Sequence, residues 1–101
     1  MDFYELLEDP ETKVILVRFV TGLPTRLKEM KDACDRGDRE SLAEIAHKLK
    51  GSSVSFGCNR LSEVAAEIET GAETGSEIEL SQKFTQASSL IRELLDRINP
   101  K

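Results

Sequence analysis

The chain has 101 residues, of which 39% are hydrophobic and 33% charged, and its formal net charge at pH 7 is −5. This length fits one domain over residues 1–101, with the composition of a folded, water-soluble protein. The acidic balance argues against a nucleic-acid partner, because phosphate binding relies on Lys and Arg. No apolar run approaches the roughly 20 residues of a membrane-spanning helix. The N-terminus MDFYELLEDP lacks the basic start and apolar core of a secretory signal, so we expect a cytoplasmic protein that does not bind membranes.

The two cysteines, Cys34 and Cys58, stand far apart and not in a CxxC arrangement. We expect both to be small apolar core residues rather than a disulfide or a zinc site. Because the chain has one histidine and two cysteines, we expect no metal site.

The N-terminus predicts a short helix. Asp2 and Glu5 form a capping-box pattern ahead of Leu6 and Leu7, which indicates a helix that covers one end of a bundle.

A long helix is predicted next. It begins at Asp9-Pro10, an N-cap followed by proline at the first helical position, and ends at Arg36-Gly37. Pro24 predicts a kink, with a break after Gly22 as the alternative. The inward face repeats at spacings of four and three residues: Leu16, Val20, Leu23, Leu27, Met30 and Cys34.

The helix that carries the only histidine starts at Asp38, its N-cap. Its predicted inward face comprises Leu42, Ile45, Ala46, Leu49, Ser53 and Phe56. At about 100° per residue, His47 lies about 160° from the mean direction of that face. His47 is therefore predicted to point away from the core.

Two more helices complete the pattern. Gly57 predicts a turn, and Asn59–Thr70 predicts a helix with Gly71 as its C-terminal cap. A capping-box pattern over residues 76–79 opens the last helix, which ends before Pro100. The inward residues of these helices are Leu61, Val64, Ala65 and Ile68, then Leu80, Phe84, Ala87, Ile91, Leu94 and Ile98.

These elements predict an all-α fold. No segment alternates as a strand does, and the connections at residues 35–38, 55–58 and 71–76 are short enough to make consecutive helices antiparallel neighbours. We expect an up-and-down four-helix bundle with a short N-terminal lid helix.

The helix surface beside His47 carries mostly small, apolar residues. Ala43 and Gly51 lie one helical turn on either side, Val54 lies two turns on, and Lys50 follows at the three-residue spacing. A glycine inside a helix costs about 1 kcal/mol relative to alanine. We interpret Gly51 as clearing space for a partner, and the alternative is a helix C-cap.

The charges around His47 favour an anion. No acidic residue lies between residues 44 and 63, whereas Lys48, Lys50 and Arg60 do. Imidazole is largely neutral and nucleophilic near pH 7, and Lys50 is placed to offset negative charge attached to it. Taken alone, Lys50 is better explained as a solvated surface lysine.

The run HKLKGSSVSFG from His47 to Gly57, followed by Leu61, resembles the signature of the histidine-containing phosphotransfer (HPt) family. That signature is H-x-L-K-G-S-S/A-x-x-x-G with a leucine four residues on. The helix pattern of nearly the whole chain, including the turn at Gly37-Asp38, is similar to the family as well.

The resemblance implies a phosphorelay intermediate. His47 would accept a phosphoryl group on Nε2 from an aspartyl phosphate of one receiver domain and pass it to the aspartate of another. The implied partners are receiver domains of response regulators or hybrid histidine kinases. The chain itself is expected to be a monomer. Lys50 and Gly51 would support the phosphoryl site, and the residues implied to bind the partner are Ala43, Lys48, Val54 and Arg60.

In such modules the magnesium ion and acidic pocket belong to the receiver, so no metal or cofactor is expected here. The sequence also lacks a phosphate loop of the form GxxxxGK[ST], which predicts a carrier without ATP-dependent kinase activity.

Two other functions fit parts of the pattern. The chain would be a helical adaptor if His47 were incidental and the strip only bound a signalling partner. It would be an enzyme if His47 were a general base, but that role needs an orienting carboxylate and a pocket, and the sequence indicates neither.

Overall fold

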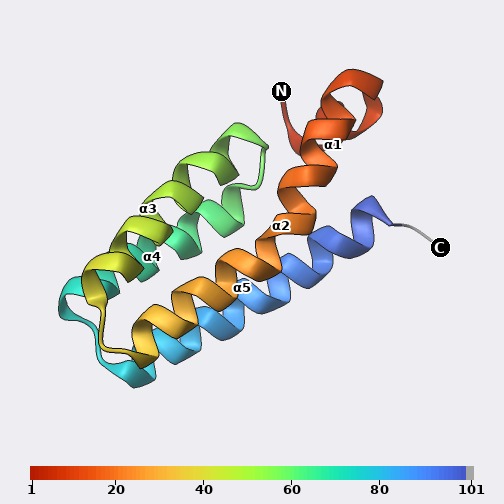
Figure 1. Cartoon of the computed structure of the whole chain (residues 1–101). Coiled ribbons are helices and arrows are strands. Elements are labelled where there is room, and N and C mark those ends of the chain that lie inside the picture. The colour runs from red at the N-terminus through yellow and green to blue at the C-terminus, as the bar shows by residue number, and fades with distance from the viewer. Residues whose placement is uncertain (100–101) are drawn as a thin grey trace.

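The computed structural model describes residues 1–99, and the chain in that range is helical with no strand (Figure 1). The expected all-α fold is confirmed. Pro100, expected to end the last helix, lies outside the described residues. The helices are α1 (Phe3–Glu8), α2 (Pro10–Asp35), α3 (Arg39–Ser55), α4 (Asn59–Thr74) and α5 (Glu77–Ile98).

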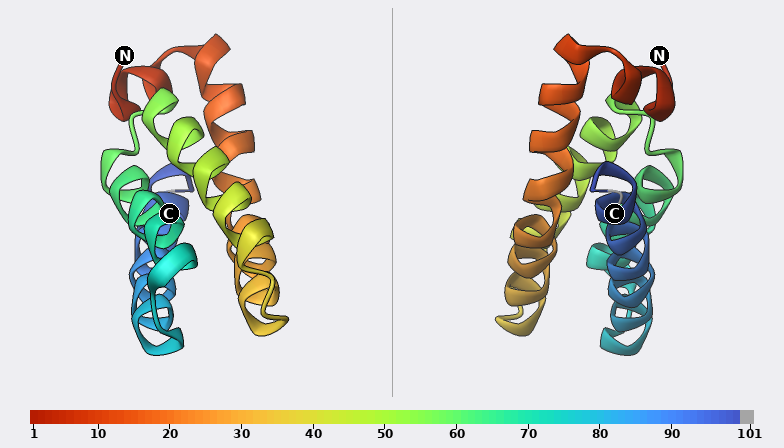
Figure 2. Two further views of the ribbon diagram at one scale, coloured as in Figure 1. Left: turned by 90° about the vertical axis from the view of Figure 1, so that its left-hand side faces the viewer. Right: turned by 90° about the vertical axis from the view of Figure 1, so that its right-hand side faces the viewer.

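The four long helices form a ring of neighbours. α2 packs against α3 and α5, and α4 packs against α3 and α5, with short connections that make the bundle run up and down. Figure 2 shows α1 across the end of the bundle at which α3 turns into α4. Among residues 1–99, no helix is long and apolar enough to cross a membrane.

Side chains cap the helices as the sequence predicts. The Asp2 carboxylate accepts the Glu5 N–H at 2.9 Å, and Asp9 and Asp38 cap α2 and α3. Ser76 caps α5 by accepting the Glu79 N–H at 3.1 Å. The second half of the expected capping box differs, because the Glu79 carboxylate accepts the Ser76 hydroxyl rather than its backbone N–H.

The core contains the predicted apolar faces, including both cysteines as free thiols. On α3, Leu42, Ala46 and Leu49 are buried as expected. Ile45 and Phe56 are only half-buried, because they lie at the edge that faces α2. There Phe56 stacks on Phe19, with 4.5 Å between the ring centroids.

The structure rules out one alternative helix boundary and corrects one expected boundary. α2 is continuous through Pro24, so the alternative break after Gly22 does not occur, and the kink at Pro24 stays a prediction. α4 continues past Gly71 to Thr74, and its C-cap is Gly75. Gly71 instead permits close packing, because a Cβ there would lie 3.1 Å from the Leu80 side chain.

Arg39 ties the start of α3 to the end of α4. Its guanidinium donates to the carbonyl oxygens of Gly71, Ala72 and Gly75 at 3.1–3.4 Å. The last carbonyls of a helix lack intrahelical partners, so this side chain satisfies them and fixes α4 along α3.

Gly57 lets α1 close over the turn between α3 and α4. Its φ is +71°, in the left-handed region, and a Cβ there would lie 2.9 Å from the Asp2 carbonyl carbon and against the Phe3 nitrogen. Gly37 has a similar φ of +74° but open space around it.

Replacing each of these glycines by alanine separates the cost of the left-handed backbone conformation from the cost of the close approach of α1. Gly37→Ala should lower the free energy of unfolding by about 1–2 kcal/mol, the cost of a left-handed conformation. Gly57→Ala should lose more and should release α1, because the methyl group displaces the α1 backbone. Urea unfolding and hydrogen exchange of α1 measure both effects. Equal losses in the two variants, with α1 still protected, would contradict this close packing.

Candidate functional site

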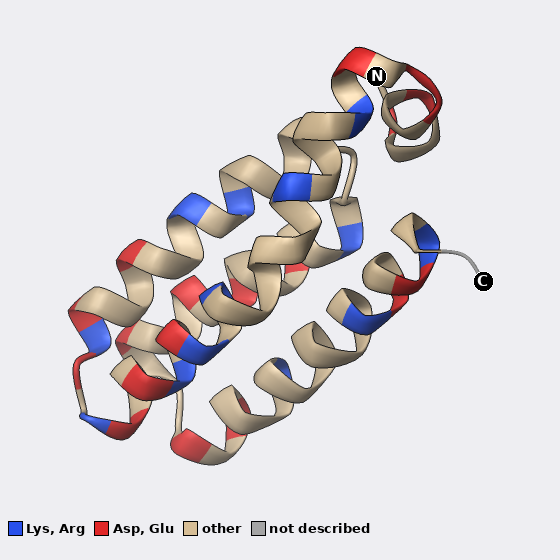
Figure 3. Cartoon of the chain, turned by 45° about the vertical axis from the view of Figure 1, so that its right-hand side comes forward, with Lys and Arg blue, Asp and Glu red and all other residues tan. Residues whose placement is uncertain are grey.

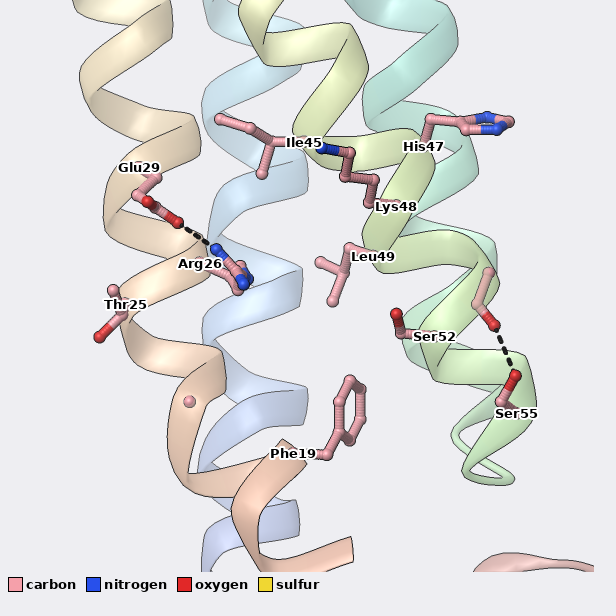
Figure 4. A pocket seen from close by; sticks show the side chains of 12 residues that line it. Phe19, Thr25, Arg26, Glu29, Ile45, His47, Lys48, Leu49, Ser52 and Ser55 are labelled. Atoms are coloured by element: carbon pink, nitrogen blue, oxygen red, sulfur yellow. Dashed lines mark hydrogen bonds and ion pairs between the residues drawn. The ribbon is translucent and has the colours of Figure 1, made fainter. Parts of the chain in front are cut away.

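His47 lies in the middle of α3 with 65% of its side chain exposed. The outward placement predicted from helix phase agrees with this position, which follows from the burial of Leu42, Ala46 and Leu49 on the opposite side. Figure 4 shows the ring directed away from α2. The imidazole is therefore open to an approaching molecule.

Glu69 on α4 orients the imidazole. Its Oε2 lies 2.8 Å from His47 Nδ1, and its Oε1 lies 2.8 Å from Lys50 Nζ. A carboxylate has no proton to donate, so Nδ1 must carry the hydrogen and donate it to Glu69. The neutral ring then keeps its lone pair on Nε2, which is the nitrogen left available as a nucleophile.

The charge of Glu69 is secured by its two partners. The hydrogen bond from Lys50, followed by that from His47, holds the pKa of the Glu69 carboxyl below its usual range. Glu69 is therefore ionised near neutral pH and acts only as an acceptor. Lys50 has three N–H donors, so its bond to Glu69 leaves two for an anion beside the ring.

A groove between α2 and α3 borders the histidine, with a volume of about 1140 Å³. In Figure 4, Phe19 and Leu49 lie on either side of this space, and Arg26 and Glu29 pair across one turn of α2. Its α3 wall comprises Ile45, His47, Lys48, Leu49, Gly51, Ser52 and Ser55.

Gly51 is helical, exposed and one turn from His47, and a Cβ there would meet nothing within 4 Å. Because α3 continues to Ser55 and φ is not positive at Gly51, the C-cap alternative is wrong. Its missing side chain leaves free space beside the imidazole.

Figure 3 shows Asp and Glu crowded at the end of the bundle where α2 meets α3 and α4 meets α5. The middle of α3, by contrast, carries lysines at positions 48 and 50. His47 thus lies beside these lysines, away from that end of the bundle.

Comparison with known proteins shows the family of this chain. Residues 14–99 match the family described as Hpt domain. The chain belongs to that family. Two curated relatives, both named phosphorelay protein LuxU and from Vibrio vulnificus strains YJ016 and CMCP6, are each 36% identical over 69 residues. Each match covers 68% of this chain and 60% of the relative, so less than two thirds of the length of each relative is matched. No solved structure gave a significant match.

The other residues expected in this Hpt domain are spread over its surface. Lys48 lines the groove beside His47, and Val54 is 58% exposed on α3. Ala43 is half-buried, in a separate shallow hollow between α3 and α4. Arg60 lies near the turn that α1 covers, where Glu63 is 3.9 Å away, and it does not line the groove. Residues 1–99 contain no group of three or more His, Cys, Asp or Glu placed to hold a metal ion.

Sequence reasoning missed Glu69, so the expectation that no carboxylate orients His47 is wrong. A signal for it was present. In an antiparallel helix pair, residues equally far from the turn face each other, and His47 and Glu69 stand equally far from Cys58, the N-cap of α4. Ser62 was missed as well, and its hydroxyl donates to the Lys50 carbonyl at 3.0 Å.

Proposed function

We propose that this chain acts as a single Hpt domain that carries a phosphoryl group on His47 between receiver domains of a two-component phosphorelay. In the first step, the Nε2 lone pair attacks the phosphorus of an aspartyl phosphate, and the P–O bond breaks to return a carboxylate. In the second, the aspartate of another receiver attacks the phosphorus, and the P–N bond breaks. The curated relatives named phosphorelay protein LuxU support this proposal.

The observation that carries the proposal is the pair of contacts that Glu69 makes. Its bond to His47 Nδ1 leaves Nε2 as the free nucleophile, and its bond to Lys50 holds a cation within reach of the ring. Phosphoryl transfer depends strongly on such positioning of the reacting atoms and on neutralisation of the charge of the phosphoryl group.

The surroundings of His47 support docking of another folded protein. The imidazole is exposed, Gly51 leaves space beside it, and the neighbouring groove is partly apolar through Phe19 and Leu49. We propose Lys48 and Val54 as contacts of the receiver at this surface, with Ala43 and Arg60 towards its edges. The domain would then supply the nucleophile and the docking surface, as a carrier without kinase activity of its own.

His47→Gln tests the proposal. Incubation with a phosphorylated receiver domain should give the wild-type chain an acid-labile phosphate, and the variant should gain none because it lacks the nucleophile. Circular dichroism should show the same helix content in both, since the side chain is exposed. Ser89→Ala, a change at an exposed position of α5 that does not line the groove, serves as the control and should label normally. Label retained on His47→Gln would refute the carrier function, and receiver binding without any label would favour the adaptor.

Two substitutions at Gly51 separate docking from folding. Gly51→Ala should raise the free energy of unfolding by up to about 1 kcal/mol, because alanine is the better helix former and its Cβ meets no neighbour. Gly51→Gln should keep a melting temperature at or above that of the wild type, yet strongly reduce transfer and receiver affinity by filling the space beside His47. Thermal unfolding and transfer kinetics, measured on both variants, test this. Full transfer in a stable Gly51→Gln variant would show that the receiver does not use this space.

A further inference from the structure

The contact between Glu69 and His47 has a different effect once Nε2 carries a phosphoryl group. Nδ1 then bears either a proton, which makes the ring cationic, or a lone pair. The 2.8 Å approach of the Glu69 carboxylate is favourable only to the protonated form, because a lone pair on Nδ1 would face an oxygen that has only lone pairs. This geometry therefore favours the cationic form of phosphohistidine.

The protonation of Nδ1 determines the leaving group when the phosphoryl group departs. As the P–N bond breaks, its electron pair passes to Nε2. A protonated Nδ1 makes the leaving group a neutral imidazole, whereas an unprotonated Nδ1 makes it an imidazolate anion. The bond to the leaving atom is largely broken in the transition state of phosphoryl transfer, so the neutral leaving group departs much faster.

We propose, on the basis of the phosphorylation of His47 proposed above, that Glu69 is a positioning residue that keeps Nδ1 of phosphohistidine protonated and thereby sets how readily the phosphoryl group leaves. The group is transferred to an aspartate, or to water in hydrolysis, with formation of a P–O bond. Glu69 thus acts in the second step of the relay as well as in the first.

Lys50 opposes this effect. Its Nζ lies 2.8 Å from Oε1 of the same Glu69 carboxylate and partly neutralises it. The positive charge of Lys50 also disfavours a cationic ring beside it. Neither α1 nor α5 lines the groove beside the ring. The charged group in contact with the ring is Glu69 on α4, and Lys50 shares that carboxylate. Lys48 adjoins His47 on α3 and Glu44 lies one turn before it. Arg26 and Glu29, which line the groove from α2, pair with each other, and the ring is directed away from them.

The test needs no receiver domain. The full chain is phosphorylated with phosphoramidate, a small-molecule phosphoryl donor, and loss of phosphohistidine is followed by phosphorus-31 NMR between about pH 6 and pH 10. Nitrogen-15 shifts of the ring report the protonation of Nδ1 in the same samples. The variants are Glu69→Gln, which keeps the shape and removes the charge, and Lys50→Gln. Glu67→Gln is the matched control, because Glu67 is on the same helix but pairs with Lys83 of α5.

In Glu69→Gln, the midpoint of both pH profiles should move down by about one pH unit, so that hydrolysis in the upper range slows by up to about tenfold. Lys50→Gln should move the midpoint up, and Glu67→Gln should leave it unchanged. These opposite shifts keep the test decisive even if one variant folds poorly. Profiles that coincide for labelled wild type, Glu69→Gln and Lys50→Gln would overturn the inference while the carrier function stands. Failure of wild-type His47 to take up phosphate from either phosphoramidate or a phosphorylated receiver would overturn the proposed function, and the inference with it.

Discussion

The site depends on the register between α3 and α4. At one end of this helix pair, Arg39 donates to two carbonyl oxygens of α4 and to that of Gly75, which follows α4. Towards the other end, Ser62 on α4 donates to the Lys50 carbonyl on α3. Glu69 lies between these two attachments. A shift of one helical residue, about 1.5 Å along the axis, would spoil its 2.8 Å contacts with His47 and Lys50.

This register lets one carboxylate perform two tasks. Glu69 places the hydrogen of the imidazole on Nδ1, and it holds the Lys50 ammonium next to the ring. Neither task requires a deep pocket, so the histidine remains exposed. The buried side of α3 supplies the rigidity, because Leu42, Ala46 and Leu49 fix the rotation of the helix about its axis.

The sequence predicts well what depends on one helix at a time. The caps at Asp2 and Asp38 and the outward direction of His47 follow from local spacing, and the structure agrees with each. The prediction that Gly71 ends a helix was wrong. Glycine at this position permits close packing against Leu80 of another helix and does not form a local turn.

Glu69 was overlooked for a related reason. It adjoins the core residue Ile68 in the sequence and carries no motif of its own, and it reaches His47 only through the pairing of two helices. The groove beside the site is equally non-local, since Phe19 and Arg26 come from α2. Residue patterns thus singled out His47 and its outward direction, whereas its surroundings required the packed bundle.

The nitrogen that bears phosphorus tests the central claim most directly, namely that Glu69 reserves Nε2 of His47 for the phosphoryl group. In the phosphorylated chain labelled with nitrogen-15 in histidine, NMR should show a one-bond coupling between phosphorus-31 and Nε2, with the hydrogen on Nδ1. A coupling to Nδ1 instead would mean that Glu69 does not hold that nitrogen, and it would contradict the account.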